Sequence, residues 1–138
     1  MAFETIFTAT ATSHGGRNGH SETTDGSVKA DLGFPKGGAL EPGKTTPEHL
    51  FATGYAACFG GALELVAKGK GVDASQAEIT ISASLGKVDG GFGLAVKITG
   101  KVPGKSAAET LELLEAAHQV CPYSKATRGN IPVELTAA

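Results

Sequence analysis

The stretch that decides the fold is TPEHLFATGYAACFGGALELVAKGK, residues 46–70. It opens with the signature of a helix start, because the hydroxyl of Thr46 can cap free backbone N–H groups and Pro47 fits the first helical position. Gly69 and Gly71 mark the end of the helix. The sequence therefore predicts one long helix between these two signals.

Apolar residues cover almost every face of this predicted helix, and Glu64 is the only charged residue between positions 50 and 66. A helix that is apolar all round is typical of the centre of a domain. At a rise of about 1.5 Å per residue, its apolar part is about 25 Å long. Because Gly54, Gly60 and Gly61 also interrupt it, we expect a core helix rather than a membrane span.

Cys58 lies in the middle of the helix and, by helical spacing, shares a face with Phe51, Tyr55, Ala62 and Leu65. A buried cysteine in a packed helix is by default a small, inert hydrophobic side chain. The three glycines argue for more than packing, because each costs about 1 kcal/mol of helix stability relative to alanine. They suggest either close approach of another backbone or room for a ligand beside the thiol.

Length and charge narrow the classes of protein. The 138 residues favour a single domain, residues 1–138, with a substantial core. A net charge of −2, a pI near 6.1 and scattered lysines and arginines argue against a nucleic-acid-binding surface. The N-terminal residues 1–4 show no signal-peptide pattern, and no membrane segment is evident, so we expect a cytoplasmic protein.

The remaining elements follow from periodicity and turn residues. We expect strands at residues 3–12 and 27–34, a turn at 13–20, and a hairpin of 77–88 with 94–102. Ser106 and Glu109 form a capping box that opens a second helix, and Pro122 should end or redirect it. We expect a short helical turn at 122–128 and a last strand at 131–136. This order predicts an α+β domain rather than repeated βαβ units.

Two cysteines, Cys58 and Cys121, carry most of the chemical information. In a reducing compartment a permanent structural disulfide is not expected, whereas a transient catalytic disulfide is allowed. The four histidines show no paired metal-ligand spacing, and His118 with Cys121 would supply only two ligands. No metal site is therefore expected.

A reactive Cys58 would need a nearby cation, because the thiolate is the nucleophile and a residue in mid-helix gains little from a helix terminus. Arg17 is the best candidate, since it lies in a glycine-flanked turn, and Arg128 is the second. Each also fits a plain surface role. Glu48 could hold and orient Arg17, or could simply stabilise the helix dipole.

Helical spacing limits how these residues can meet. Ten residues separate Glu48 from Cys58, which is about 15 Å along a straight helix and about 80° out of phase. One straight helix cannot hold cysteine, arginine and glutamate in a compact cluster. Either the helix bends near Gly54, or Glu48 arrives from a partner subunit. We prefer the partner, which would make the protein an obligate dimer with shared sites.

Cys121 is the only other thiol and could resolve a sulfenic acid on Cys58 by forming a disulfide. Its place before Pro122 and a helical turn could lower its pKa. The alternative is two unrelated buried cysteines. An apolar substrate would need an apolar pocket, for which the candidates are Phe51, Tyr55, Phe59 and Tyr123, although such aromatics are also common in cores.

Two segments of the chain resemble those of a known family. Residues 46–59, TPEHLFATGYAACF, look like the first-cysteine helix of the OsmC/Ohr proteins. Residues 120–131, VCPYSKATRGNI, look like their second-cysteine segment. Four short motifs resemble those of the Ohr branch, the organic hydroperoxide resistance proteins: CPYS at 121–124, TRGNI at 127–131, ATAT at 9–12 and GGR at 15–17. The resemblance covers essentially the whole chain.

The resemblance implies an OsmC-like fold, with antiparallel sheets around a buried central helix, in an intertwined homodimer with its sites at the interface. It implies a thiol peroxidase that reduces organic hydroperoxides without metal, flavin or haem. Position by position, Cys58 matches the peroxidatic cysteine, Cys121 the resolving cysteine, Arg17 the activating arginine and Glu48 its orienting carboxylate. The implied reductant is a lipoyl dithiol (dihydrolipoamide or a lipoylated protein) rather than thioredoxin.

Three other functions compete with this interpretation. One is an OsmC-branch peroxidase of broader substrate range. Another is a small hydrophobic-ligand binding protein whose cysteines belong to the core. The third is a redox sensor that signals through its disulfide, although no surface for nucleic acid or another partner is legible in the sequence.

Overall fold

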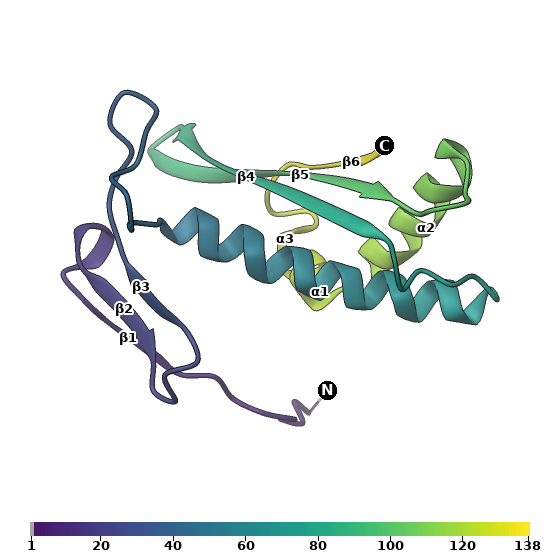
Figure 1. Cartoon of the computed structure of the whole chain (residues 1–138), viewed down its shortest axis with the longest axis horizontal. Coiled ribbons are helices and arrows are strands. Elements are labelled where there is room, and N and C mark those ends of the chain that lie inside the picture. Colours follow the sequence, from purple (N-terminus) through teal and green to yellow (C-terminus); the bar gives the residue numbers. More distant parts are fainter. Residues whose placement is uncertain (1) are drawn as a thin grey trace. The chain divides into compact units, whose positions relative to one another are not determined.

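The computed structural model describes residues 2–138, and its chain divides into two compact units, Met1–Leu50 and Phe51–Ala138. Figure 1 traces the elements of both units along the chain. They combine helices with two separate three-stranded sheets, so the predicted α+β class is confirmed.

The first unit contains a small antiparallel sheet. Its strands are β1 (Ala11–His14), β2 (His20–Thr23) and β3 (Lys29–Asp31), in that order across the sheet. A 3₁₀ turn, η1 (Gly16–Asn18), joins β1 to β2. Gly19 closes this turn, and a Cβ at that position would collide with the carbonyl oxygen of His14. The turn that carries Arg17 therefore depends on a glycine.

Two strand predictions in this unit are wrong in extent. A strand was expected over 3–12, but β1 covers only residues 11–14. Residues 3–10 belong to no strand: the carbonyl of Thr10 accepts from the Thr24 N–H at 2.8 Å, but no ladder of backbone hydrogen bonds continues toward residue 3 in the described chain. The strand expected at 27–34 shortens to β3 at 29–31, while β2 occupies a segment for which no strand was predicted.

The long helix α1 (Pro47–Gly69) has the predicted limits and runs from the first unit into the second. Thr46 caps it, accepting a hydrogen bond from the His49 backbone N–H at 3.1 Å. Its buried residues are Tyr55, Phe59, Ala62, Leu63 and Ala67. By contrast Leu65, expected on the Cys58 face in the core, is 67% exposed. The buried residues recur at intervals of three or four positions and so form one face of α1.

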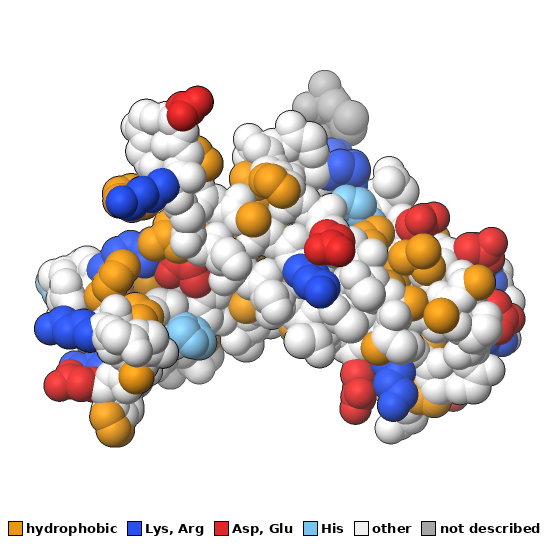
Figure 2. Space-filling model, turned by 90° about the horizontal axis from the view of Figure 1, so that it is seen from above, with side chains coloured by type: hydrophobic (Ala, Val, Ile, Leu, Met, Phe, Trp, Pro, Cys, Tyr) orange, Lys and Arg blue, Asp and Glu red, His pale blue; other side chains and the backbone are white. Residues whose placement is uncertain are grey.

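By length and composition alone, α1 could cross a membrane. A single helix of this kind is weak evidence for a membrane span, because core helices of soluble proteins have the same length and apolar composition. The buried side chains of α1 belong to the hydrophobic core of the second unit, which is the behaviour of a core helix. On the face shown in Figure 2, lysine and arginine side chains lie among aspartates and glutamates and form no separate basic area.

The second unit is built on the predicted hairpin of β4 (Glu78–Val88) and β5 (Gly91–Lys101). One detail of its sheet differs from the expected antiparallel arrangement. The last strand, β6 (Val133–Ala137), pairs with β5 in parallel. Two helices, α2 (Ala107–Val120) and α3 (Pro122–Thr127), separate β5 from β6, and such a helical crossover returns the chain in the same direction.

The core of this unit lies between the sheet, α1 and α2. Phe59 and Leu63 of α1, Ile98 of β5 and Leu114 of α2 belong to one buried cluster, with no exposed surface. The capping box of Ser106 and Glu109 starts α2 as predicted. This packing places the end of α2, and the cysteine that follows it, within the same cluster as α1.

Candidate active site

Two cysteines of the second unit meet although 63 residues separate them in the chain. The sulfur of Cys121, at the end of α2, lies 3.4 Å from that of Cys58 in α1, so the thiol of Cys121 can donate to the Cys58 sulfur. Both cysteines are free thiols. Cys121 is fully buried and Cys58 is partly exposed, so reagents reach this pair from the Cys58 side.

Cys121 occupies the junction of two helices. It is both the C-cap of α2 and the N-cap of α3, and its backbone is extended because Pro122 follows it. Its sulfur accepts a hydrogen bond from the Ser124 backbone N–H at 3.5 Å. The predicted break at Pro122 and the short helix after it are thus confirmed, and together they aim the Cys121 thiol at α1.

The surroundings of Cys58 disfavour its ionised form. Burial raises the pKa of the Cys58 thiol, and the hydrogen bond and charge of Cys121 raise it further. The backbone N–H of Tyr123 acts in the opposite direction. No cation of the second unit contributes to this balance among the described residues. A reactive Cys58 therefore still needs the cation that the sequence analysis required.

Three aromatic rings gather beside the thiols. Phe51 stacks on Tyr123, with ring centroids 6.2 Å apart and planes 14° apart, and it meets Tyr55 edge-on at 5.6 Å. Tyr123 is 41% exposed and Phe51 is half-buried, whereas Tyr55 and Phe59 have no exposed surface. Of the four aromatics expected to bind substrate, only Phe51 and Tyr123 present surface in this chain.

The Tyr55 hydroxyl belongs to a buried polar group that the sequence analysis missed. It lies 2.8 Å from the Ser124 hydroxyl and 3.0 Å from the Thr127 hydroxyl, and all three side chains are buried. These bonds tie α1 to α3, the helix that begins at the Cys121 sulfur. The signal available in the sequence was a pair of hydroxyl residues spaced three apart in a six-residue helix.

Of the three interior glycines of α1, Gly54 has a clear packing reason. A Cβ at this position would lie 3.2 Å from the Tyr123 hydroxyl, so glycine lets the tyrosine ring approach the helix closely. Nothing lies within 4 Å of a Cβ built at Gly60 or Gly61. Among residues 2–138, then, the close approach is by a side chain and not by another backbone, and of these three glycines it occurs at Gly54 alone.

Arg17 and Glu48 form a two-pronged ion pair in the first unit. The guanidinium donates from Nη2 to Oε1 at 2.7 Å and from Nη1 to Oε2 at 2.9 Å. The hydrogen bond from Arg17 is the main cause that lowers the Glu48 pKa, and the same bond raises the Arg17 pKa. Both partners come from one chain, and this paired geometry fixes the direction of the guanidinium.

Arg128, the second candidate cation, is occupied elsewhere. Its Nη1 donates to the backbone carbonyl of His118 in the last turn of α2, at 2.7 Å. This contact stabilises a helix C-terminus. Among residues 2–138, no group of three or more histidine, cysteine or acidic side chains is placed to hold a metal ion.

Comparison with known proteins assigns the chain to a family. Residues 38–136 match the family model described as OsmC-like protein. The chain therefore belongs to the OsmC family. Solved structures agree, including an OsmC-like protein from Mycoplasma pneumoniae that is 18% identical, with a TM-score of 0.74 over 97% of this chain and 98% of that one, a likeness of fold alone.

Within that family the chain belongs to the organic hydroperoxide resistance (Ohr) branch. The organic hydroperoxide resistance protein of Xanthomonas axonopodis pv. citri (strain 306) is 48% identical over 136 residues, 96% of this chain and 95% of the relative. The crystal structure of the organic hydroperoxide resistance protein OhrB of Bacillus subtilis is 44% identical, with a TM-score of 0.88 over 97% of this chain and 100% of that one.

Proposed function

We propose that this protein is a thiol peroxidase that reduces organic hydroperoxides to alcohols, with Cys58 as the peroxidatic and Cys121 as the resolving cysteine. The 3.4 Å separation of the two sulfurs carries the proposal, because a small local shift converts that distance into a disulfide bond. The relatives named for organic hydroperoxide resistance support a role in peroxide detoxification.

The reaction proceeds in three steps. The Cys58 thiolate attacks the distal oxygen of ROOH, the O–O bond breaks, and ROH leaves after protonation, which makes Cys58 a sulfenic acid. The Cys121 sulfur then attacks the Cys58 sulfur, releases water and forms the disulfide. A dithiol finally reduces the disulfide and is itself oxidised. The sum is ROOH plus a dithiol giving ROH, water and a disulfide.

Arg17 supplies the cation that the Cys58 thiolate needs, and Glu48 orients it. The ten-residue helical spacing between Glu48 and Cys58 supports a shared site, in which the Arg17–Glu48 pair of one subunit serves the cysteines of the other. We therefore propose a homodimer. Large apolar side chains exposed in the single chain support it, because monomeric soluble proteins seldom leave so many uncovered: Phe3, Ile6, Phe7, Leu65 and Phe92.

The substrate is an alkyl or fatty-acid type hydroperoxide rather than hydrogen peroxide. Phe51 and Tyr123 offer it apolar surface near Cys58. The buried Tyr55 packs against both rings, and the buried Phe59 packs against Tyr55. The organic group of such a substrate is bound favourably when it is buried against this apolar surface. Hydrogen peroxide has no organic group and cannot make that contact.

A lipoyl dithiol, free or protein-bound, recycles the enzyme, as the resemblance to the Ohr branch implies. We place the protein in the cytoplasm, where the reducing conditions that a thiol catalyst needs are maintained.

The proposal is tested by following the loss of cumene hydroperoxide with wild type, Cys58→Ser and Cys121→Ser, using dihydrolipoamide or thioredoxin as the reductant. We expect turnover with dihydrolipoamide, none in Cys58→Ser, and a single unproductive turnover in Cys121→Ser. Turnover that survives in Cys58→Ser would overturn the proposal. An inactive wild type that binds the hydroperoxide unchanged would identify a ligand-binding protein instead.

A further inference from the structure

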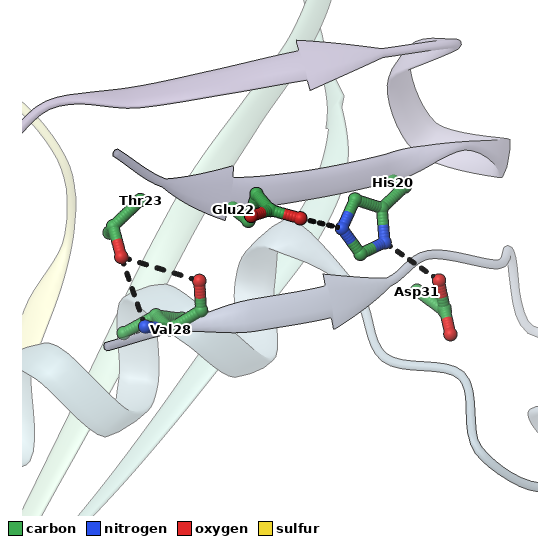
Figure 3. A network of polar contacts seen from close by, with 5 residues as sticks. All are labelled: His20, Glu22, Thr23, Val28 and Asp31. Atoms are coloured by element: carbon green, nitrogen blue, oxygen red, sulfur yellow. Dashed lines mark hydrogen bonds and ion pairs between the residues drawn. The ribbon is translucent and has the colours of Figure 1, made fainter. Parts of the chain in front are cut away.

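A histidine on the sheet of the first unit is bonded to two carboxylates at once. His20 begins β2, and its Nδ1 lies 2.8 Å from the Asp31 carboxylate of β3. Its Nε2 lies 2.8 Å from the carboxylate of Glu22, two residues further along β2. Figure 3 shows the imidazole held between these two groups, one at each ring nitrogen.

Two carboxylates can both accept from this ring only when both nitrogens carry protons, which is the imidazolium form. The hydrogen bonds to Asp31 and then Glu22 raise the pKa of His20, and the bond to His20 lowers that of Asp31. The other ionisable groups of this area, on the neighbouring strands and the following loop, are His14 opposite His20, Lys29 opposite Glu22, and Lys44, whose charge acts on Asp31.

The position of His20 connects the segments that carry Arg17 and Glu48. The 3₁₀ turn with Arg17 ends at Gly19, immediately before His20, and the Gly19 carbonyl accepts from the Leu32 N–H at 2.8 Å. On the other side, the Asp31 carbonyl accepts from the Thr45 N–H at 2.9 Å. Thr45 lies three residues before Glu48, and Arg17 three residues before His20.

We propose that protonated His20 is a positioning residue that locks the Arg17 turn to the segment leading to Glu48 through its bonds to Asp31 and Glu22. The proposal rests on the proposed function for its catalytic consequence, because Arg17 and Glu48 act there on Cys58. His20 itself touches neither of them in this role. It fixes the two chain segments from which they project.

The stabilisation by the His20 hydrogen bonds to Asp31 and Glu22, here called the lock, depends on pH in a defined direction. Because folding raises the pKa of His20, the stabilisation is complete below the pKa of histidine in the unfolded chain. It is lost as the pH rises through the higher pKa of the folded state. Above that pH one ring nitrogen becomes an acceptor facing a carboxylate, so one bond is replaced by repulsion. The Arg17 turn then loosens on the alkaline side.

Hydrogen exchange of the backbone amides at residues 16–19 tests the lock without any assay of activity. We expect wild type to lose protection, after correction for intrinsic exchange rates, as the pH rises through the His20 pKa. His20→Gln should be less protected at every pH below that point, whereas His20→Arg, which keeps a charged donor with two prongs, should be protected throughout. His14→Gln, on the opposite strand position, is the matched control and should behave as wild type.

Peroxidase activity then tests the catalytic consequence. Below the His20 pKa, we expect kcat/KM with cumene hydroperoxide to be roughly two- to fivefold lower in His20→Gln than in wild type, which corresponds to the free energies of exposed ion pairs. As the pH rises, we expect the kcat/KM of wild type to decline relative to that of His20→Arg. A loss of kcat/KM in His20→Gln that is the same at every pH would overturn the proposal. So would hydrogen exchange at residues 16–19 that is unchanged from wild type in both His20→Gln and Asp31→Asn. Wild type without peroxidase activity would refute the proposed function, while the exchange data would still decide the lock.

Discussion

The Cys121 sulfur lies 3.4 Å from the Cys58 sulfur across the junction of α1 with the end of α2. A disulfide brings two sulfurs to about 2.0 Å, so the pair must close by roughly 1.4 Å. One equivalent of cumene hydroperoxide should therefore take the titratable thiols of wild type from two per chain to none. Intact mass spectrometry under non-reducing conditions should show an internal disulfide. Disulfides linking two chains would contradict this geometry.

Removing the guanidinium should leave Cys58 with the raised pKa that its own surroundings impose. Burial is the main cause of that rise, and a raised thiol pKa means less thiolate at neutral pH. In Arg17→Gln, the alkylation rate of Cys58 by iodoacetamide should therefore reach its midpoint at a higher pH than in wild type. Both proteins are best compared in a Cys121→Ser background, and Arg128→Gln serves as the control. Identical pH profiles of alkylation in Arg17→Gln and wild type would show that Arg17 does not stabilise the Cys58 thiolate.

Tyr55→Phe should destabilise the fold by about 1–3 kcal/mol, because it removes the hydroxyl that contacts both buried hydroxyls and leaves Thr127 only its bond to the Ser124 carbonyl. Urea unfolding at a fixed protein concentration measures the effect, since association would otherwise alter the apparent stability. Tyr123→Phe, which changes a ring 41% exposed, is the control and should cost less. Equal losses in the two variants would show that the buried hydroxyl group contributes little.

Gly100→Ala should destabilise the second unit by about 1–3 kcal/mol through overpacking. A Cβ at Gly100 on β5 would collide with the Leu114 side chain of α2, which has no exposed surface. Gly86→Ala on the paired strand β4 is the matched control, because nothing lies within 4 Å of its Cβ. Thermal unfolding should separate the two variants clearly, and similar melting temperatures would refute the packing argument.

Much of the architecture could be predicted because its signals are local. Thr46 and Pro47 mark the start of α1, and the capping box of Ser106 and Glu109 marks that of α2; each acts within a few residues, and the structure has both. The hairpin of β4 and β5 was equally legible, since a long alternating pattern on each side of a glycine turn leaves few other pairings.

What could not be predicted depends on partners distant in the sequence. Residues 3–10 have strand-like composition, yet composition does not supply a neighbouring strand. The sequence indicates an apolar ring at Tyr55, whereas the partners of its hydroxyl lie 69 and 72 residues away in the chain. The two cysteines could be named from the sequence, but the 3.4 Å between them follows from how α2 packs on α1.

The sulfur of Cys121 also closes the first turn of α3 by accepting the Ser124 N–H. In the proposed cycle this sulfur is bonded to Cys58 in the oxidised protein, so the acceptor of the Ser124 N–H changes from a thiol to a disulfide sulfur. We therefore expect the chemical shift of the Ser124 backbone amide, followed in 15N-labelled protein, to report whether the cysteine pair is reduced or oxidised.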